Sequence, residues 1–420
     1  MNSHARTSCP SKRLRFLTQR GLSAEQRQLL ALRSQVTFLP MEAIGEQGEL
    51  DLSNARERED VETGYTQFFD GDVVVAKITP CFENGKGALV KGTLEGVGFG
   101  TTELHVLTPS SELDGRFLYY VTASAPFRRL GEARMIGAAG QKRVPEDFVR
   151  DYPTVVPPLP QQRAIADYLD RETARLDAVI GAKERLLELL AEKRRALITH
   201  AVTRGLNPKA PLRDSGIPWL GKIPEHWEVQ RSRWLFRERD QRSETGEEEM
   251  LTVSHLTGVT PRSEKDVNMF EAETTEGYKI CLAGDLVINT LWAWMGAMGV
   301  ANVSGIVSPA YNVYHPGPRL EPSFVDALVR MPVFAQEVTR YSKGVWSSRL
   351  RLYPEGFFEV FLPVPPLDEQ RAIVAYIAAE THELTTLGSA TERTITLLKE
   401  RRAALIAAAV TGQIDVEAAT

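Results

Sequence analysis

The chain contains little cysteine and no long apolar run. Its three cysteines, Cys9, Cys81 and Cys281, lie far apart and form no Cys-x-x-Cys pair. This spacing argues against a disulfide framework or a cysteine zinc site and predicts buried thiols in a reducing compartment. No run approaches the roughly 18 apolar residues that span a membrane, and the first 16 residues include no apolar stretch like that of a secretory signal. These absences favour a cytoplasmic protein.

The sequence also lacks the motifs of common catalytic sites. It contains no Gly-x-x-x-x-Gly-Lys-Ser/Thr loop for nucleotide phosphates and no His-Glu-x-x-His metal motif. The tetrapeptides Asn-Pro-Pro-Tyr and Asp-Pro-Pro-Tyr, which mark amino-methyltransferase pockets, are absent, and the seven histidines are scattered. The sequence therefore predicts a chain that is not an enzyme and that holds neither a metal ion nor a cofactor of its own.

Positive charge is scarce overall but concentrated in two places. The formal net charge of −5 argues against a uniformly basic nucleic-acid binder. Residues 128–143, however, carry Arg128, Arg129, Arg134, Lys142 and Arg143 against one acid, and residues 340–351 carry Arg340, Lys343, Arg349 and Arg351 with none. A solvated surface is the alternative explanation for either stretch. Their recurrence at similar places in the two halves of the chain favours a polyanionic ligand.

What the chain does contain is a long internal repeat. Residues 156–203 align without a gap on residues 364–411, and 25 of the 48 positions are identical at a constant offset of 208. The offset is close to half of the 420 residues. The chain is therefore expected to consist of two tandem halves, each a variable domain followed by one long helix.

Apolar residues recur at three- and four-residue steps through both copies, which predicts two helices. Acids lie early and bases late in each copy, and Gly205 and Gly412 follow the last apolar residues, as is typical of helix ends. Gly181 and Gly388 are candidates for a kink or break within the helices. One apolar stripe of this length needs a partner, so we expect the two helices to form an intramolecular antiparallel coiled coil. The expected seam comprises Ile165, Leu169, Leu176, Leu187, Leu190 and Leu197 with Ile373, Ile377, Leu384, Leu398 and Leu405.

The two variable domains share an order of elements but few residues. In the first, Gly71-Asp72 precedes an apolar strand over 73–78, followed by a loop at 80–87 and a single amphipathic helix over 116–130. In the second, Gly284-Asp285 precedes a strand at 286–289, a tryptophan-rich loop and a helix near 324–339. We therefore predict an α+β fold with two α/β domains in tandem. The expected parts are 1–158 (first domain), 159–204 (central helix), 205–226 (linker), 227–363 (second domain), 364–412 (distal helix) and 413–420 (tail).

The repeated residues resemble a known family. The shared pattern Pro-Pro-Leu-x-x-Gln-Arg-Ala-Ile, followed by Tyr, Glu-Thr and Ala-Leu-Ile…Ala-Val-Thr, is similar to the paired helices of type I restriction–modification specificity subunits. Residues 214–227, DSGIPWLGKIPEHW, resemble the usual entry into the second target-recognition domain of that family. The first half has no such segment and begins almost directly at residues 12–16, so its start is expected to be trimmed or misassigned.

The resemblance implies a non-catalytic DNA-recognition subunit. Each variable domain would read one half of a bipartite, asymmetric site on double-stranded DNA, and the helices would hold the domains apart with pseudo-twofold symmetry. Two methylation subunits would dock on the helices and supply S-adenosylmethionine chemistry at adenine. A motor–nuclease subunit would join where the complex also cleaves DNA, as part of phage defence.

Arginine, lysine and asparagine suit contacts to bases and phosphates, and they gather in the divergent loops. The candidate DNA-binding residues are Lys77, Asn84, Lys86, Lys142 and Arg143 in the first domain, and Asn289, Trp292, Trp294, Lys343, Ser347, Ser348 and Arg349 in the second. The tryptophans are equally compatible with a place in the core. Two alternatives to the DNA-recognition subunit are a stand-alone DNA-binding regulator with internal duplication and, with less support, a structural coiled-coil protein.

Overall fold

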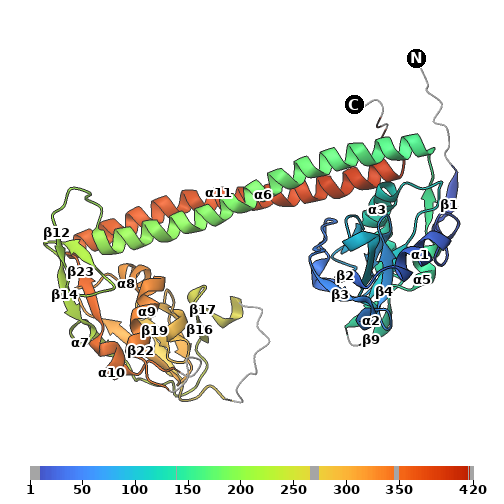
Figure 1. Ribbon diagram of the computed structural model, residues 1–420. Coiled ribbons are helices and arrows are strands. Elements are labelled where there is room, and N and C mark those ends of the chain that lie inside the picture. Colours follow the sequence, from blue (N-terminus) through green and yellow to red (C-terminus); the bar gives the residue numbers. More distant parts are fainter. Residues whose placement is uncertain (1–9, 139, 265–273, 345–349, 415, 417–420) are drawn as a thin grey trace. The chain divides into compact units, whose positions relative to one another are not determined.

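The computed structural model describes residues 10–138, 140–264, 274–344, 350–414 and 416. The chain divides into two compact units: unit 1 comprises Met1–Glu184 and Arg393–Thr420, and unit 2 comprises Arg185–Glu392 (Figure 1). Each unit contains one mixed α/β domain and parts of both long helices.

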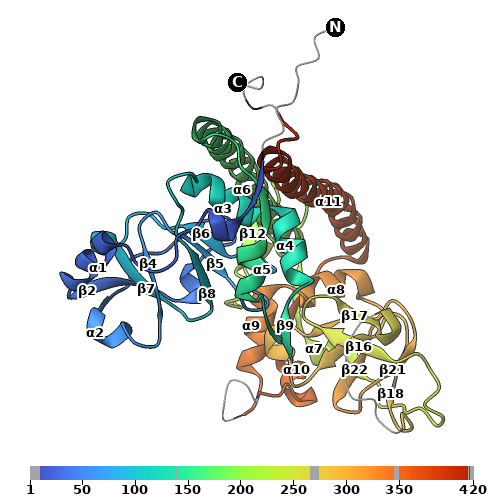
Figure 2. The same cartoon turned by 90° about the vertical axis from the view of Figure 1, so that its right-hand side faces the viewer.

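The domain of unit 1 is built on two small sheets (Figure 2). One has the order β3-β2-β7-β4 and the other the order β6-β5-β8, and among these strands only β2 and β7 run parallel. The strands are β2 (Gln35–Leu39), β3 (Ala55–Glu57), β4 (Thr66–Phe69), β5 (Val73–Ala76), β6 (Gly87–Leu89), β7 (Val97–Gly100) and β8 (Leu104–Leu107). All four residues of β5 are buried, so this strand forms the centre of the domain.

The helices of this domain correct one expectation. The segment 116–130, predicted as a single helix, forms α3 (Gly115–Ala123) and α4 (Ala125–Glu132). Ser124 between them is extended, with φ −70° and ψ 145°. Pro126 at the start of α4 lacks the amide hydrogen that a continuous helix would need, so the chain restarts there. The remaining elements are α1 (Ala24–Ala31), α2 (Arg58–Val61), α5 (Glu146–Asp151) and the hairpin of β9 (Ile136–Ala138) and β10 (Gln141–Arg143).

Unit 2 has a four-stranded antiparallel sheet of order β15-β22-β19-β20 and two separate strand pairs, β16-β17 and β18-β21. The strands are β15 (Phe236–Glu238), β16 (Leu251–Ser254), β17 (Gly258–Pro261), β18 (Lys279–Cys281), β19 (Leu286–Asn289), β20 (Met298–Val300), β21 (Gly305–Val307) and β22 (Tyr311–Pro316). The helix expected near 324–339 is again two helices, α8 (Pro322–Val329) and α9 (Pro332–Arg340), divided before Pro332. Two shorter helices are α7 (Ser232–Leu235) and α10 (Pro354–Glu359).

The same turn introduces β5 and β19. Gly71 and Gly284 adopt positive φ values of 97° and 92°, which glycine tolerates and other residues rarely adopt. The aspartate after each glycine is buried and accepts a backbone hydrogen bond: Asp72 from Phe69 N at 2.8 Å and Asp285 from Leu282 N at 2.9 Å. Burial raises the pKa of Asp72. The Gly-Asp pairs noted in the sequence thus build equivalent strand starts.

Each domain is closed by its first and last strands. In unit 1, β1 (Ser11–Arg13) pairs antiparallel with β11 (Pro153–Val155), and in unit 2, β14 (Glu228–Arg231) pairs with β23 (Phe361–Val364). Residues 205–226, expected to be a linker, contain their own antiparallel pair, β12 (Leu212–Asp214) and β13 (Lys222–Pro224). Leu220 and Ile223 of this segment are buried in the core of unit 2, so the connection is folded.

The repeated segments form the helices α6 (Leu159–Arg204) and α11 (Leu367–Val410). Gly181 and Gly388 do not end these helices, contrary to the suggestion of a break. Gly205 and Gly412 follow the helix ends with a φ of 71° each, as expected of C-terminal glycines. Among the described residues, no helix is both long and apolar enough to cross a membrane.

The two helices pair within each unit and run antiparallel. In unit 1, Ile165 and Leu169 from the start of α6 share a core with Ile406 and Val410 from the end of α11. Two ion pairs add to the contact, Arg402 with Asp177 at 2.9 Å and Lys399 with Glu184 at 3.2 Å. In unit 2, Ala201 and Val202 from the end of α6 pack with Ile373 from the start of α11. The expected seam residues are all at least half-buried: Ile165, Leu169, Leu176 and Ile373 are buried, and Leu187, Leu190, Leu197, Ile377, Leu384, Leu398 and Leu405 are intermediate.

Candidate nucleic-acid interface

Three of the candidate residues in unit 1 gather where β5 ends. Lys77 follows this strand directly, and its carbonyl oxygen accepts a hydrogen bond from Val144 N at 2.8 Å. Thr79 N donates to the carbonyl oxygen of Lys142 on the β9–β10 hairpin at 2.9 Å, and Lys142 N donates to the Thr79 hydroxyl at 2.8 Å. The strand end and the hairpin therefore form one surface that carries Lys77, Lys142 and Arg143.

Arg143 on this surface is held by a carboxylate. Its Nε and one terminal nitrogen donate to Glu103 at 2.9 and 2.8 Å, a bidentate arrangement. Hydrogen bonding from Arg143 holds the pKa of Glu103 below its usual value. Both Lys77 and Arg143 line a cleft of about 510 Å³. The pair fixes the orientation of the Arg143 guanidinium, which remains partly exposed.

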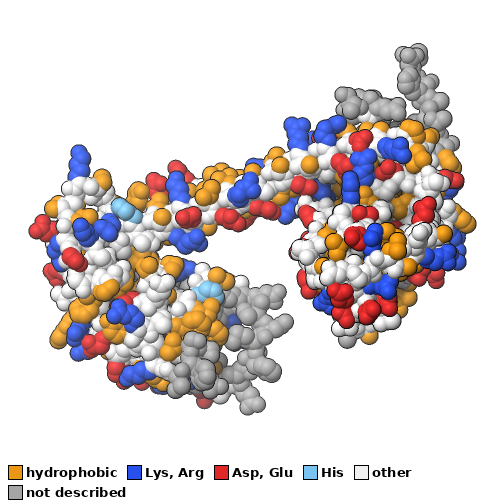
Figure 3. Space-filling view, viewed as in Figure 1, with side chains coloured by type: hydrophobic (Ala, Val, Ile, Leu, Met, Phe, Trp, Pro, Cys, Tyr) orange, Lys and Arg blue, Asp and Glu red, His pale blue; other side chains and the backbone are white. Residues whose placement is uncertain are grey.

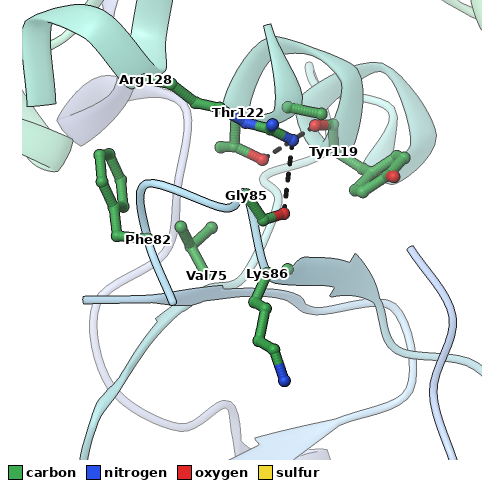
Figure 4. Close-up of a pocket in the computed structure, with 9 residues that line it drawn as sticks. Val75, Phe82, Gly85, Lys86, Tyr119, Thr122 and Arg128 are labelled. Carbon is green, nitrogen blue, oxygen red and sulfur yellow. Dashed lines mark hydrogen bonds between the residues drawn. The ribbon is translucent and has the colours of Figure 1, made fainter. Parts of the chain in front are cut away.

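The loop at 80–87 carries the other two candidates of unit 1. Asn84 is exposed, whereas Lys86 is half-buried and donates from Nζ to the carbonyl oxygen of Met41 at 3.0 Å. Arg128 lies against the loop from the other side and donates to the carbonyl oxygen of Gly85 at 3.3 Å (Figure 4). Burial lowers the pKa of Arg128. Arg128 belongs to the basic stretch 128–143, but it supports the loop from inside instead of facing solvent.

The strand end in unit 2 has the same construction. Leu352 N donates to the carbonyl oxygen of Thr290 at 3.1 Å, as Val144 N does to Lys77. Val144 and Leu352 are 208 residues apart, the offset of the helical repeat. The Thr290 hydroxyl binds the carbonyl oxygen of Ala310 at 2.8 Å, whereas Lys77 N binds that of Glu103 at 2.9 Å. Thr290 and Ala310 thus occupy the places of Lys77 and Glu103.

The three candidates beside this strand end have different surroundings. Asn289 is only 6% exposed, and its Oδ1 is buried without a hydrogen-bond partner, so it faces the interior and is badly placed for a base contact. Trp292 is 51% exposed and stacks on Trp294 with ring centroids 6.1 Å apart. Trp294 donates from its indole nitrogen to the carbonyl oxygen of Leu291. The stacked pair presents an aromatic surface, and Trp292 is not a core residue.

Only part of the second basic stretch falls within the described residues. Lys343 is exposed and forms an antiparallel bridge with Arg351, while Ser347, Ser348 and Arg349 lie outside the described residues. Arg340 is paired with Glu337 at 3.1 Å. Arg351, not chosen as a candidate, is exposed and lies 208 residues after Arg143. The offset of 208 between Arg143 and Arg351 is the signal by which the sequence could have identified Arg351 as a candidate.

Two glutamines of the repeat anchor the domains to their helices. Gln162 and Gln370 have no exposed surface. Gln162 accepts from Asp114 N and donates to the carbonyl oxygens of Glu112 and Pro157, all at 2.8 to 2.9 Å. Gln370 makes the matching bonds in unit 2 to the backbone of residues 321, 319 and 365. Sequence reasoning gave these residues no role, although their identity in both copies could have indicated one.

Metal ligands do not gather in the described part of the chain: no group of three or more His, Cys, Asp or Glu side chains there could hold an ion. Cys281 is buried, as predicted for the thiols, and burial raises its pKa to about 12. Cys81 is half-buried, and Cys9 lies outside the described residues.

Comparison with known proteins identifies the relatives of this chain. No protein-family model matches it. It is 39% identical over 179 residues to the specificity subunit of the type I restriction enzyme EcoEI of Escherichia coli, a match over 39% of this chain and 30% of that protein. It is 43% identical over 135 residues to the EcoAI specificity subunit of Escherichia coli, over 31% of this chain and 23% of that protein. Over these segments the chain is similar to specificity subunits of type I restriction enzymes.

Two solved structures extend the likeness in fold to nearly the whole chain. One belongs to a study of complex assembly and conformational transition in a type I restriction–modification system, with a TM-score of 0.74, 18% identity and coverage of 97% of this chain and 99% of that one. The other is the HsdS subunit of Thermoanaerobacter tengcongensis, with a TM-score of 0.57, 18% identity and coverage of 97% and 98%. The specificity-subunit fold, with two mixed α/β domains and paired long helices, is therefore confirmed. The sequence matches cover less than a third of either curated relative.

Proposed function

We propose that this chain is the sequence-specific DNA-recognition subunit of a type I restriction–modification complex and has no catalytic activity of its own. The observation that carries the proposal is the contrast between the repeated helices and the domains that they hold. The helices are identical at 25 of 48 positions, whereas equivalent strand ends carry different side chains. A scaffold kept constant while its exposed loops diverge is typical of proteins that bind different ligands at equivalent sites.

Each domain would read one half of a bipartite, asymmetric site in double-stranded DNA. In unit 1, Lys77, Asn84, Lys142 and Arg143 present the charge and hydrogen-bonding groups that DNA contacts need. In unit 2, the stacked tryptophans offer an apolar surface of the kind that contacts thymine methyl groups in the major groove. The paired helices would serve as the spacer between the two domains.

We further propose that two methylation subunits bind the helices and bring S-adenosylmethionine to the target adenines. Supporting this stoichiometry, large apolar side chains are exposed at equivalent positions of both helices: Val179 matches Leu387 and Leu189 matches Leu397 at the offset of 208. Unit 1 contains Val179 and Leu397, and unit 2 contains Leu189 and Leu387. Two equivalent apolar surfaces suit two copies of one partner. A motor–nuclease subunit would join this assembly for cleavage.

The test is to map methylated adenines in cells that express the methylation subunit with and without this chain. Methylation at one bipartite motif, present only when both are expressed, is the expected result. Methylation that ignores sequence, or that occurs without this chain, would contradict the proposal. A gel-shift assay of the isolated chain distinguishes the alternative, because a stand-alone regulator would bind its site specifically without a methylation subunit.

A further inference from the structure

The bridge between Lys343 and Arg351 in unit 2 places two cations side by side. Lys343 N donates to the carbonyl oxygen of Arg351, and Arg351 N donates to that of Lys343, both at 2.9 Å. Reciprocal bonds of this kind join directly opposite residues of an antiparallel pair. The side chains of such a pair lie on one face, about 5 Å apart at their Cβ atoms, and like charges there are destabilising.

Within the part of the chain that the structure describes, no acid relieves this repulsion. Both side chains are exposed, and no ion pair joins either of them to a carboxylate among the described residues. Other arginines of unit 2 are paired: Arg239 with Asp285, and Arg340 with Glu337. Two unneutralised cations in a locally unfavourable arrangement are what an anion-binding site requires.

The equivalent position in unit 1 lacks this property. Arg143 is opposite Ile136 on the hairpin and is neutralised by Glu103. In unit 2, Ala310 stands where unit 1 has Glu103, so the equivalent carboxylate is missing, and no ion pair holds Arg351 among the described residues. The two strand ends therefore share a backbone but differ in net charge, because unit 2 has alanine in the place of Glu103 and a lysine in the place of Ile136.

We propose that Lys343 and Arg351 together bind a backbone phosphate of duplex DNA and position unit 2 without reading the base sequence. This inference rests on the proposed function and adds to it a phosphate-binding role for Arg351. The ammonium group of Lys343 and the guanidinium group of Arg351 would approach one phosphate from the same face of the bridge. The negative charge of the phosphate would take the place of the missing carboxylate. Contacts of this type contribute affinity and salt dependence to DNA binding but carry no direct sequence information.

The experiment uses the complex of this chain with its methylation subunit and two duplexes, one containing the motif mapped by methylation sequencing and one with that motif scrambled. Dissociation constants are measured at several sodium chloride concentrations for the wild type, Arg351→Gln and Lys343→Gln. The matched control is Arg237→Gln. Arg237 is also exposed, but it lies on β15 opposite His315 of β22. That position is at the other end of β22 from Tyr311, which lies opposite Asn289.

Each of the two variants is expected to reduce the slope of log K against log salt by up to about 0.9, the contribution of the one phosphate that the two side chains share, and the affinity at 0.15 M salt by up to about fivefold. The loss should be equal for the two duplexes, the methylated motif should not change, and the melting temperature should not fall. An unchanged slope, a changed motif or a lowered melting temperature would overturn the inference. If the wild-type complex does not distinguish the two duplexes, it is the proposed function that fails.

Discussion

At the scale of single residues, the two strand ends differ through a few substitutions on one backbone. Arg143 and Arg351 occupy equivalent places, but Glu103 fixes the orientation of the first, whereas Ala310 offers no such carboxylate to the second. A guanidinium with two of its donors engaged by a carboxylate loses little conformational freedom when it binds a ligand. Arg143 is thus prepared for a specific contact.

Replacing Arg143 with alanine is expected to weaken DNA binding by the complex about tenfold, or about 1.4 kcal/mol, because one oriented contact is lost. Assembly with the methylation subunit should remain intact, since the residue lies on the domain and not on the helices. Fluorescence anisotropy with the mapped duplex measures the first effect, and size-exclusion chromatography the second. Unchanged affinity would show that Arg143 does not contact DNA.

His105 predicts a pH dependence of stability. Burial lowers its pKa, and its Nε2 lies 2.9 Å from the carbonyl oxygen of Val144. The unfolded chain, with a histidine pKa of about 6.5, binds the proton more readily than the folded chain. The contribution of His105 to stability is therefore complete above about pH 6.5 and is lost as the pH falls below that value.

Thermal unfolding at pH 7.5 and pH 5.5 tests this expectation. The melting temperature of the wild type should fall on acidification by more than that of His105→Gln, which retains a hydrogen-bond donor but cannot titrate. Equal changes in the two proteins would mean that His105 does not control this part of the acid response.

At the scale of elements, the helices have two kinds of leucine with different roles. Leu398 is half-buried, whereas the adjacent Leu397 is 63% exposed. The same contrast separates Leu187 from Leu189, which is 61% exposed. Successive residues of a helix point about 100° apart, so residues one or two positions apart lie on different faces, and one of them packs against the other helix while the other stays in solvent.

Replacing Leu398 with aspartate is expected to destabilise the chain by about 2–4 kcal/mol, because a charge enters the packed face between the helices. Leu187→Asp should act in the same way. The control Leu397→Asp introduces the same charge on the exposed side and should leave stability nearly unchanged. Chemical denaturation compares the three variants, and equal losses for Leu398→Asp and Leu397→Asp would contradict the assignment of the packed face.

At the scale of the whole molecule, the duplication gives each unit the same set of parts. Each contains one domain, a buried glutamine that binds the domain backbone to a helix, and a pair of exposed apolar side chains at equivalent helix positions, Val179 and Leu397 in unit 1 and Leu387 and Leu189 in unit 2. The duplication therefore predicts function in pairs: two readers of DNA and two docking surfaces for one kind of partner.

Changing one docking surface at a time tests that prediction. Leu189→Asp alters unit 2 and Leu397→Asp alters unit 1, and each single variant is expected to bind one methylation subunit where the wild type binds two. The double variant should bind none. Native mass spectrometry counts the subunits directly. Two bound subunits in the double variant would show that these leucines do not form the docking surface.

The sequence alone determined the duplication, the two long helices and the α+β class, because apolar periodicity and a constant offset depend only on residue order. It also located the strand starts at Gly71-Asp72 and Gly284-Asp285. It was wrong about the single helices at 116–130 and 324–339, because propensity over a window did not register the restarts at Pro126 and Pro332.

Only the tertiary structure decided which candidate side chains reach solvent. Arg128 and Asn289 look like ligand-binding residues in the sequence but face inward, because burial depends on neighbours distant in the chain. The sequence did not identify Arg351 as a candidate, because its proposed phosphate-binding role depends on a backbone bridge to Lys343 and on alanine at position 310 in place of an acid. Charge can be counted from a sequence, but whether a charge is neutralised is a property of three-dimensional contacts.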